Sequence, residues 1–346
     1  MTELASLNLL EMTALFKQMG LPAFRGKQVF SWVHKGADFD DMLNLPKDLR
    51  EKLKGTCVAN PVRILTTMQS QLDGTVKFLF GLQDDNCVEG VLMRYNHGAT
   101  LCISTQVGCL MGCKFCASTL DGKVRDLTPG EMLGQILCAN QFMGEGERVH
   151  NVVLMGSGEP LDNYDNVMAF LHLLREPEGV CIGLRNVSLS TCGIVPKMRD
   201  LAKENLPVTL CVSLHAPNDK IRQETMPIAK RYSMQEVMDA CRNYIKETGR
   251  RVIFEYALVS GLNDFREHAM ELAAWLRGMQ CHVNLIPLNE VKESALKTVT
   301  SKTVAAFEET LKQCHISCTR RREMGDDIEG ACGQLRRKTI KEGAKE

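Results

Sequence analysis

The chain has 346 residues, 44% of them hydrophobic and 24% charged, which suits a globular protein with one large α/β barrel and a small accessory domain. Its 42 basic and 42 acidic residues cancel, which argues against indiscriminate nucleic-acid binding but allows local basic patches. No apolar run approaches the roughly 18 residues of a membrane span. The N-terminus carries acidic residues where a secretory signal peptide would have its basic region. The odd number of cysteines, 15, argues against a disulfide framework, and we expect a cytoplasmic protein.

Residues 1–55 are predicted to form a separate helical domain. Apolar residues recur at helical spacing over 7–19 and 24–32, and Pro46 opens a third helix. The region around the second helix mixes basic and aromatic side chains: Phe24, Arg25, Lys27, Phe30, Trp32 and Lys35. This mixture is typical of an RNA-contacting face, and equally of a solvated helix face.

Residues 56–96 are predicted to contain a β-hairpin, with strands at 75–80 and 88–93 and turn residues at 84–86. From 97 to 319, strand-like and helical runs alternate. The strand-like runs are 100–105, 152–155, 187–190, 208–213, 252–258 and 283–287. The helical runs are 129–143, 163–175, 195–204, 233–247, 264–277 and 301–313. Six such units predict a parallel sheet with right-handed crossovers, closed as a partial (β/α)6 barrel.

Residues that could bind a ligand or react follow the carboxyl ends of these strands, where binding and active sites lie in such folds. Gly156 and Gly158 allow a close backbone approach, and Glu159 offers a carboxylate to an ammonium group. The other candidates are Ser190, Ser213, Leu214, His215 and Asn289. Each of these residues could equally be a turn or core residue when taken alone, and it is their common position that favours a site.

The loop after the first strand contains Cys109, Cys113 and Cys116 in a C-x3-C-x2-C spacing. Soft thiolates favour iron–sulfur clusters, zinc or copper(I). A structural zinc needs four protein ligands, and this loop offers no fourth Cys or His. A four-iron cluster held by three thiolates keeps one iron open for an outside ligand, which is typical of a catalytic cluster. Three unrelated buried thiols are the alternative interpretation.

This loop, with Phe115 before its last cysteine, resembles the signature of the radical S-adenosylmethionine (SAM) superfamily. The resemblance implies a [4Fe-4S] cluster, SAM bound at its open iron, and reductive cleavage of SAM to a 5′-deoxyadenosyl radical. It also implies the partial barrel as the fold and a nucleic-acid-binding role for the helical domain.

Further motifs narrow the resemblance to the dual-specificity rRNA/tRNA adenine-C2 methyltransferases. These motifs are SGEP (157–160), SLHAPND (213–219) and DDIEGACGQL (326–335), and the similarity runs over essentially the whole chain. By this resemblance Cys332, in the C-terminal region 320–346, is the transiently methylated cysteine. Cys102 is its resolving partner, and Glu89 is the proton acceptor. The candidates from Gly158 to Asn289 match SAM contacts, while Ser157 and Cys192 depart from the usual pattern.

The resemblance implies methylation of 23S rRNA and of adenosine 37 in tRNA, with two SAM molecules per turnover and a reductase such as flavodoxin as electron donor. Adenine C2 and the SAM methyl group are both electrophilic, so a thiolate must first take the methyl group. A related antibiotic-resistance subgroup methylates C8 and shares both cysteines. Pro160 after Glu159, and Val107 before Gly108, favour C2. A non-catalytic RNA-binding cluster protein is the alternative from another class, but it would have no need of Cys332.

Overall fold

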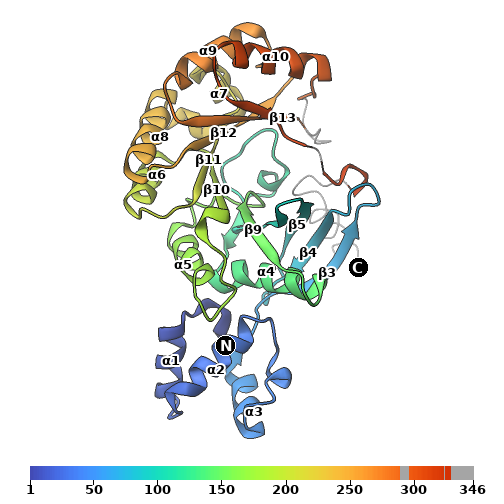
Figure 1. Cartoon of the computed structure of the whole chain (residues 1–346), viewed down its shortest axis with the longest axis vertical. Coiled ribbons are helices and arrows are strands. Elements are labelled where there is room, and N and C mark those ends of the chain that lie inside the picture. The colour runs from blue at the N-terminus through green and yellow to red at the C-terminus, as the bar shows by residue number, and fades with distance from the viewer. Residues whose placement is uncertain (289–295, 323, 329–346) are drawn as a thin grey trace.

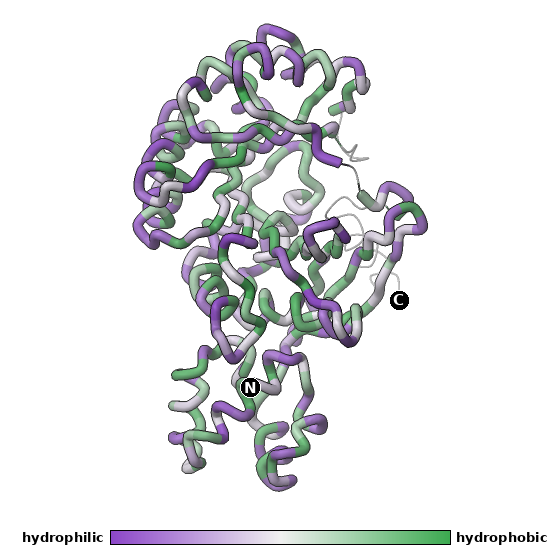
Figure 2. The backbone as a smooth tube through the Cα atoms, viewed as in Figure 1, coloured by the Kyte–Doolittle hydropathy of each residue, from purple (hydrophilic) through white to green (hydrophobic). Residues whose placement is uncertain are grey.

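The structure is a computed structural model that describes residues 1–288, 296–322 and 324–328. A curved ten-stranded sheet forms its centre, helices cover the outside of that sheet, and a small helical body lies at the N-terminal end (Figure 1). Hydrophilic and hydrophobic stretches alternate along the surrounding helices (Figure 2), as expected for helices with one face on the sheet. No helix among the described residues is long and apolar enough to span a membrane.

The N-terminal body consists of α1 (Leu9–Gln18), α2 (Ala23–Val33) and α3 (Lys47–Thr56), which confirms the three predicted helices. Asn8 begins α1 with a capping box, because its side chain accepts from the amide of Glu11 while the Glu11 carboxylate accepts from the amide of Asn8. The segment before α1 joins this body to the barrel. Glu3 accepts a 2.6 Å hydrogen bond from Thr128, and Ser6 accepts a 2.9 Å bond from the amide of Gly130.

The parallel part of the sheet has the strand order β6-β9-β10-β11-β12-β13-β14. Its strands are β6 (Gly98–Cys102), β9 (Val149–Leu154), β10 (Val187–Thr191), β11 (Thr209–Ser213), β12 (Val252–Leu258), β13 (Cys281–Pro287) and β14 (Cys318–Arg320). The first six are the predicted strands, and the partial (β/α)6 barrel is confirmed. β14 is a short seventh strand that the sequence did not predict.

The six predicted barrel helices are all present, with ends within two residues of the predicted ones. They are α4 (Pro129–Met143), α5 (Tyr164–Leu174), α6 (Val195–Lys203), α8 (Met234–Thr248), α9 (Arg266–Leu276) and α10 (Ser301–Gln313). Thr128 begins α4 and Ser233 begins α8, each with a complete capping box. A further short helix, α7 (Asp219–Thr225), was not predicted.

Three antiparallel strands extend the sheet beyond β6: β3 (Arg63–Gln69), β4 (Val76–Gly81) and β5 (Cys87–Tyr95). β4 and β5 are the predicted hairpin, and β5 pairs with β6, so the hairpin and the barrel share one sheet. The chain after β14 returns to the β3–β4 turn. There Asp327 accepts a 2.9 Å bond from the amide of Gln71, and Asp73 accepts a 2.9 Å bond from the amide of Gly325. We call these two bonds the C-terminal clasp.

The two faces of the antiparallel strands differ in chemistry. Directly opposed residues of a strand pair point to the same side, and side chains alternate along each strand. Val91 lies opposite Lys77 on one side and Cys102 on the other, and Glu89 lies two residues before Val91. Lys77, Glu89 and Cys102 therefore share the inner face of the barrel. The outer face carries the residues of the main apolar core, among them Phe78, Phe80, Val88, Leu92 and Leu101.

Candidate active site

A short hairpin encloses the three-cysteine loop. Its strands are β7 (Gln106–Gly108) and β8 (Lys123–Asp126), and the amide of Cys109 donates a 3.0 Å bond to the carbonyl oxygen of Gly122. Gly108 has φ +78°, and a Cβ atom there would lie 1.9 Å from the carbonyl oxygen of Gly122. Only glycine fits where the loop begins.

Charged and amide side chains fasten this hairpin to the loop after β9. Lys123 forms 2.8 Å ion pairs with both Asp126 and Asp162. The amide group of Gln106 donates to the same two carboxylates, at 2.7 and 2.8 Å. Two carboxylates from different segments thus share two donors, which fixes the three-cysteine loop over the end of the sheet.

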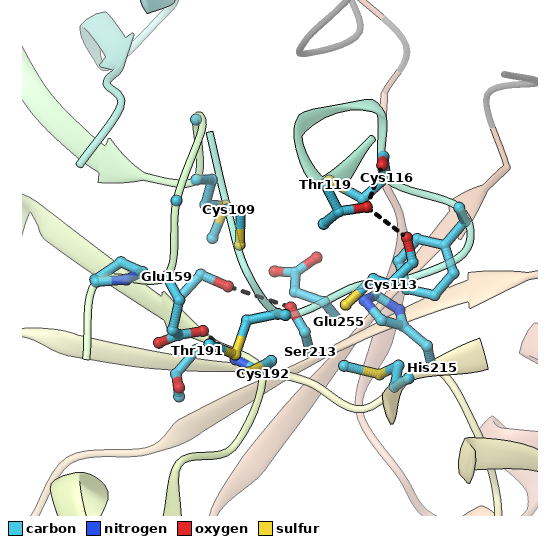
Figure 3. Close-up of a pocket in the computed structure, with 18 of the residues that line it drawn as sticks. Cys109, Cys113, Cys116, Thr119, Glu159, Thr191, Cys192, Ser213, His215 and Glu255 are labelled. Atoms are coloured by element: carbon cyan, nitrogen blue, oxygen red, sulfur yellow. Dashed lines mark hydrogen bonds between the residues drawn. The ribbon is translucent and has the colours of Figure 1, made fainter. Parts of the chain in front are cut away.

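Cys109, Cys113 and Cys116 line one pocket of about 210 Å³ at the carboxyl ends of the strands (Figure 3). Burial raises the pKa of the Cys109 thiol to about 12 and also raises that of Cys113. Bound metal cations would therefore be needed to keep these thiols deprotonated. A coordinating metal deprotonates a thiol outright. The carbonyl oxygens of Cys113 and Cys116 accept from the hydroxyl of Thr119, which fixes the loop backbone.

The arrangement of these thiols fits an iron–sulfur cluster better than a single ion. Among the described residues, no three Cys, His, Asp or Glu side chains form a group that could hold one metal ion. A zinc ion would draw its sulfur ligands to about 2.3 Å from one point. A cluster is wider, and each cysteine binds its own iron atom, so thiols distributed around a pocket suit it. No disulfide joins two of the described cysteines.

The structure brings most of the predicted strand-end residues to the same pocket. Its lining includes Gly158, Glu159, Ser190, Ser213 and His215 together with the three cysteines. The hydroxyls of Ser190 and Ser213 are 3.4 Å apart on neighbouring strands. Leu214 is fully buried in the apolar core instead. Asn289 and Cys332 lie outside the described residues, and their roles stay predictions.

Glu159 is held by the backbone. Its carboxylate accepts a 3.0 Å bond from the amide of Leu161 and a 2.7 Å bond from the amide of Cys192. Burial raises the pKa of Glu159, and these two amides oppose the shift. The neighbouring Gly158 has φ +110°, and a Cβ there would lie 2.6 Å from Cβ of Gln106. Gly158 was predicted to allow a close approach of its backbone to a ligand, and its backbone also lies close to the chain's own β7 strand.

His215 has an unusual backbone and a defined tautomer. Its φ is +54°, and its Nδ1 atom accepts a 2.9 Å bond from the amide of Ala257. Burial lowers the pKa of His215 to about 3, so the ring is neutral and carries its proton on Nε2. The ring packs edge-on against Phe115 of the three-cysteine loop, with the ring centres 4.8 Å apart.

The sequence did not single out Glu255, which also lines the pocket. It is the one acidic residue of β12, and its Oε1 atom accepts a 2.9 Å bond from Asn284. Its buried Oε2 atom has no hydrogen-bond partner among the described residues, and its carboxylate points into the pocket (Figure 3). Burial raises its pKa. A lone acid inside an apolar strand was the available signal.

Glu89 and Cys102 lie close to this pocket on the inner face. Glu89 forms a buried 3.1 Å ion pair with Lys77. Cys102 is buried in a small apolar cluster with Val91, against which Met155 packs. Met155 also lines the cysteine pocket, so it joins the two regions. Met324, from the segment after β14, packs on the same cluster.

A parallel α/β sheet with three cysteines in the loop after its first strand defines a radical SAM protein. The family model of the Radical SAM superfamily matches residues 103–275. A second family model, the ribosomal RNA large subunit methyltransferase N-terminal domain, matches residues 2–59.

Known proteins resemble the chain over almost its full length. A "Probable dual-specificity RNA methyltransferase RlmN" from Clostridium beijerinckii is 53% identical over 341 residues, which are 98% of this chain and 96% of the relative. A protein of the same name from Alkaliphilus oremlandii is 52% identical, with 98% of each chain covered. The crystal structure of a radical SAM methyltransferase from Sphaerobacter thermophilus superimposes with a TM-score of 0.94 at 42% identity, covering 96% of this chain and 99% of the other. The chain belongs to the RlmN family of dual-specificity radical SAM RNA methyltransferases.

Proposed function

We propose that this protein methylates C2 of an adenosine in 23S rRNA and of adenosine 37 in tRNA. The relatives are named as dual-specificity RNA methyltransferases, which supports the proposal that the substrates are RNA. The observation that carries the proposal is the inner face of the barrel. A carboxylate, Glu89, and a thiol, Cys102, lie there on neighbouring strands, beside the pocket that the three-cysteine loop lines. An RNA-binding cluster protein without catalysis would need neither group.

Two sets of residues would bind the cofactors. Cys109, Cys113 and Cys116 would hold the [4Fe-4S] cluster, and the pocket around them would take SAM, two molecules for each turnover. The cluster and SAM, when bound, supply a 5′-deoxyadenosyl radical, and a flavodoxin-type reductase would supply the electron. The proposed SAM contacts are Gly158, Glu159, Ser190, Ser213, His215 and Asn289, with Leu214 contributing through its main chain because its side chain lies in the core.

The chain's own chemistry would be carried by two cysteines and a carboxylate. Cys332, as the thiolate, would take a methyl group from SAM by displacement. Once this S-methyl group has lost a hydrogen atom to the 5′-deoxyadenosyl radical, its carbon would bond to C2 of adenine. Glu89 would accept the proton that leaves C2, and the adduct would give up one electron, for which the oxidised cluster is the available acceptor. The RNA would then be joined to the protein through the sulfur of Cys332. Cys102 would attack this sulfur, and its thiol proton would pass to the released carbon, which gives methylated RNA and a disulfide between the two cysteines.

Substitution of Cys102 tests this proposal directly. Cys102→Ala leaves the three-cysteine loop and Cys332 intact, so it should accumulate protein joined covalently to RNA and stable in denaturant. The double variant Cys102→Ala with Cys332→Ala should trap no RNA, because no sulfur is left to form the bond. Cys241→Ala, at another buried cysteine on α8, is the matched control and should turn over normally. Normal turnover by Cys102→Ala would refute the two-cysteine mechanism.

The position of methylation is tested separately. Adenosine labelled with deuterium at C2 should lose the label on methylation, while a C8 label should be retained. Loss of the C8 label instead would assign the chain to the C8-methylating activity and would leave the two-cysteine mechanism standing.

A further inference from the structure

Arg222, in the middle of α7, is a fully buried arginine with an incomplete set of partners. Its Nη2 atom donates a 2.6 Å hydrogen bond to the carbonyl oxygen of Cys192. Its Nε and Nη1 atoms are buried and have no hydrogen-bond partner among the described residues. None of its side chain is exposed. Two buried guanidinium nitrogens without acceptors are unusual and call for an explanation.

The charge on this side chain makes the arrangement energetically costly by itself. An arginine stays protonated in proteins because its ordinary pKa is above about 12. Burial lowers the pKa of Arg222, which reflects the loss of hydration. Burying an ion costs several kcal/mol even after relaxation, unless an opposite charge lies nearby. The folded protein therefore needs an anion close to Arg222.

No described carboxylate is in direct contact with Arg222, which takes part in no ion pair among the residues that the structure describes. Asp219, on the same helix, acts on Arg222 only from beyond ion-pair distance, and its carboxylate accepts a 2.8 Å bond from the amide of Met234. The other titratable groups that affect Arg222 are thiols, namely those of Cys192, Cys113 and Cys241, and His215 is a neutral neighbour. Of these thiols, Cys113 belongs to the proposed cluster ligands.

The helix that carries Arg222 is attached directly to the three-cysteine loop. The amide of Lys114, next to Cys113, donates a 2.9 Å bond to the carbonyl oxygen of Thr225, the last residue of α7. Gly112, just before Cys113, packs so closely on Pro227 that a Cβ atom would lie 3.3 Å from its ring. The position of Arg222 relative to Cys113 is therefore fixed by one backbone hydrogen bond and one ring contact, on the two sides of that cysteine.

We propose that Arg222 is the buried counter-charge of the iron–sulfur cluster held by Cys109, Cys113 and Cys116, and that it raises the reduction potential of this cluster. The inference rests on the cluster ligands proposed above. Uptake of one electron from a reductase adds one negative charge to the cluster. A fixed positive charge in a low-dielectric surrounding stabilises the more negative state, and net charge is one of the levers that set cluster potentials.

The test compares reduction potentials in reconstituted protein. Arg222→Met keeps the length of the side chain but removes the charge, and it should shift the one-electron equilibrium at least tenfold toward the oxidised cluster. For one electron this is a fall of about 59 mV in a titration followed by electron paramagnetic resonance. Arg222→Lys keeps the charge and should retain most of the potential. The control is Arg250→Met, which should leave the reduction potential unchanged. Arg250 precedes the amino-terminal end of β12 and donates to the hydroxyl of Thr209, whereas the cysteine pocket lies at the carboxyl ends of the strands.

A second measurement separates this role from a structural one. If Arg222 serves the cluster, Arg222→Met should unfold without the cluster at a temperature no lower than the wild-type protein, since it removes an unpaired buried charge. The increase in melting temperature on cluster loading should become smaller. An unchanged potential in Arg222→Met, or a variant that fails to fold, would overturn the inference. Failure of the wild-type protein to take up a cluster would instead refute the proposed ligands, and the inference with them.

Discussion

The ion pair between Lys77 and Glu89 offers a quantitative test of how burial sets the energy of a charge. The side chains are only 1% and 5% exposed, and Nζ lies 3.1 Å from Oε2. Lys77→Met has a similar length but removes the counter-charge that forms the ion pair with the buried Glu89 carboxylate. Breaking a buried pair in this way costs about 3–5 kcal/mol, because the remaining buried charge loses its counter-charge.

The expected loss follows from burial and not from distance. Arg94 and Glu147 form a shorter pair, 2.6 Å, but their side chains are 45% and 49% exposed. An exposed pair contributes about 0–1 kcal/mol, because water screens it. Arg94→Met should therefore lower the free energy of unfolding by less than about 1 kcal/mol, while Lys77→Met lowers it several-fold more.

Urea unfolding of the protein without cofactors measures these differences. The double variant Lys77→Met with Glu89→Leu removes both charges, so it should be more stable than Lys77→Met alone. Equal losses from Lys77→Met and Arg94→Met would refute the reasoning. A double variant that is less stable than Lys77→Met would also contradict it, since the loss would then come from packing.

Two further predictions concern stability. Burial lowers the pKa of His34 from 6.5 to about 4, so below pH 6.5 the unfolded chain takes up a proton that the folded chain refuses, and stability is lost as the pH falls toward 4. His34→Leu should remove this contribution, about 1.4 kcal/mol for each pH unit, in urea unfolding compared at pH 7 and pH 5; an unchanged slope would contradict it. Asp73→Ala removes the acceptor for the amides of Gly325 and Thr75, so it should destabilise the protein by about 1–2 kcal/mol and speed hydrogen exchange at 324–328. Unaltered exchange there would mean that other contacts hold the segment.

The fold was predictable because local signals and tertiary packing agree. The barrel helices longer than eight residues are long enough to show apolar residues at helical spacing, as in α8, and several have a signal for their start: Thr128 for α4, Ser233 for α8 and a proline in the first turn of α6. The missed elements carry weak patterns. β14 has three residues and α7 has seven, and neither length supports a periodic pattern. β3 has seven residues, but they are mostly polar and exposed, so no apolar alternation marks the strand.

The site was predictable where spacing is specific and missed where it depends on tertiary contact. The C-x3-C-x2-C spacing indicated three converging thiols, and they line one pocket. Lys77 and Arg222 were missed because a lone charged residue in a strand or helix looks like a surface residue until its neighbours are known. Glu255 was missed although its position as the one acid in an apolar strand was a signal. The expectation that Glu159 binds a ligand ammonium stays a prediction. Its carboxylate also accepts from two backbone amides, and no sequence pattern reveals such partners.

The C-terminal clasp has a consequence for the order in which the molecule is completed during synthesis. Its two hydrogen bonds join residues 252 and 256 positions apart. At about 5–20 residues per second, the β3–β4 turn leaves the ribosome roughly 13–50 s before its partners. A chain that stops before β14 would present β13 as an open sheet edge, which is a template for aggregation. Only chains that extend through β14 can cover this edge, so products that terminate earlier should be recognised as unfinished by their exposed strand.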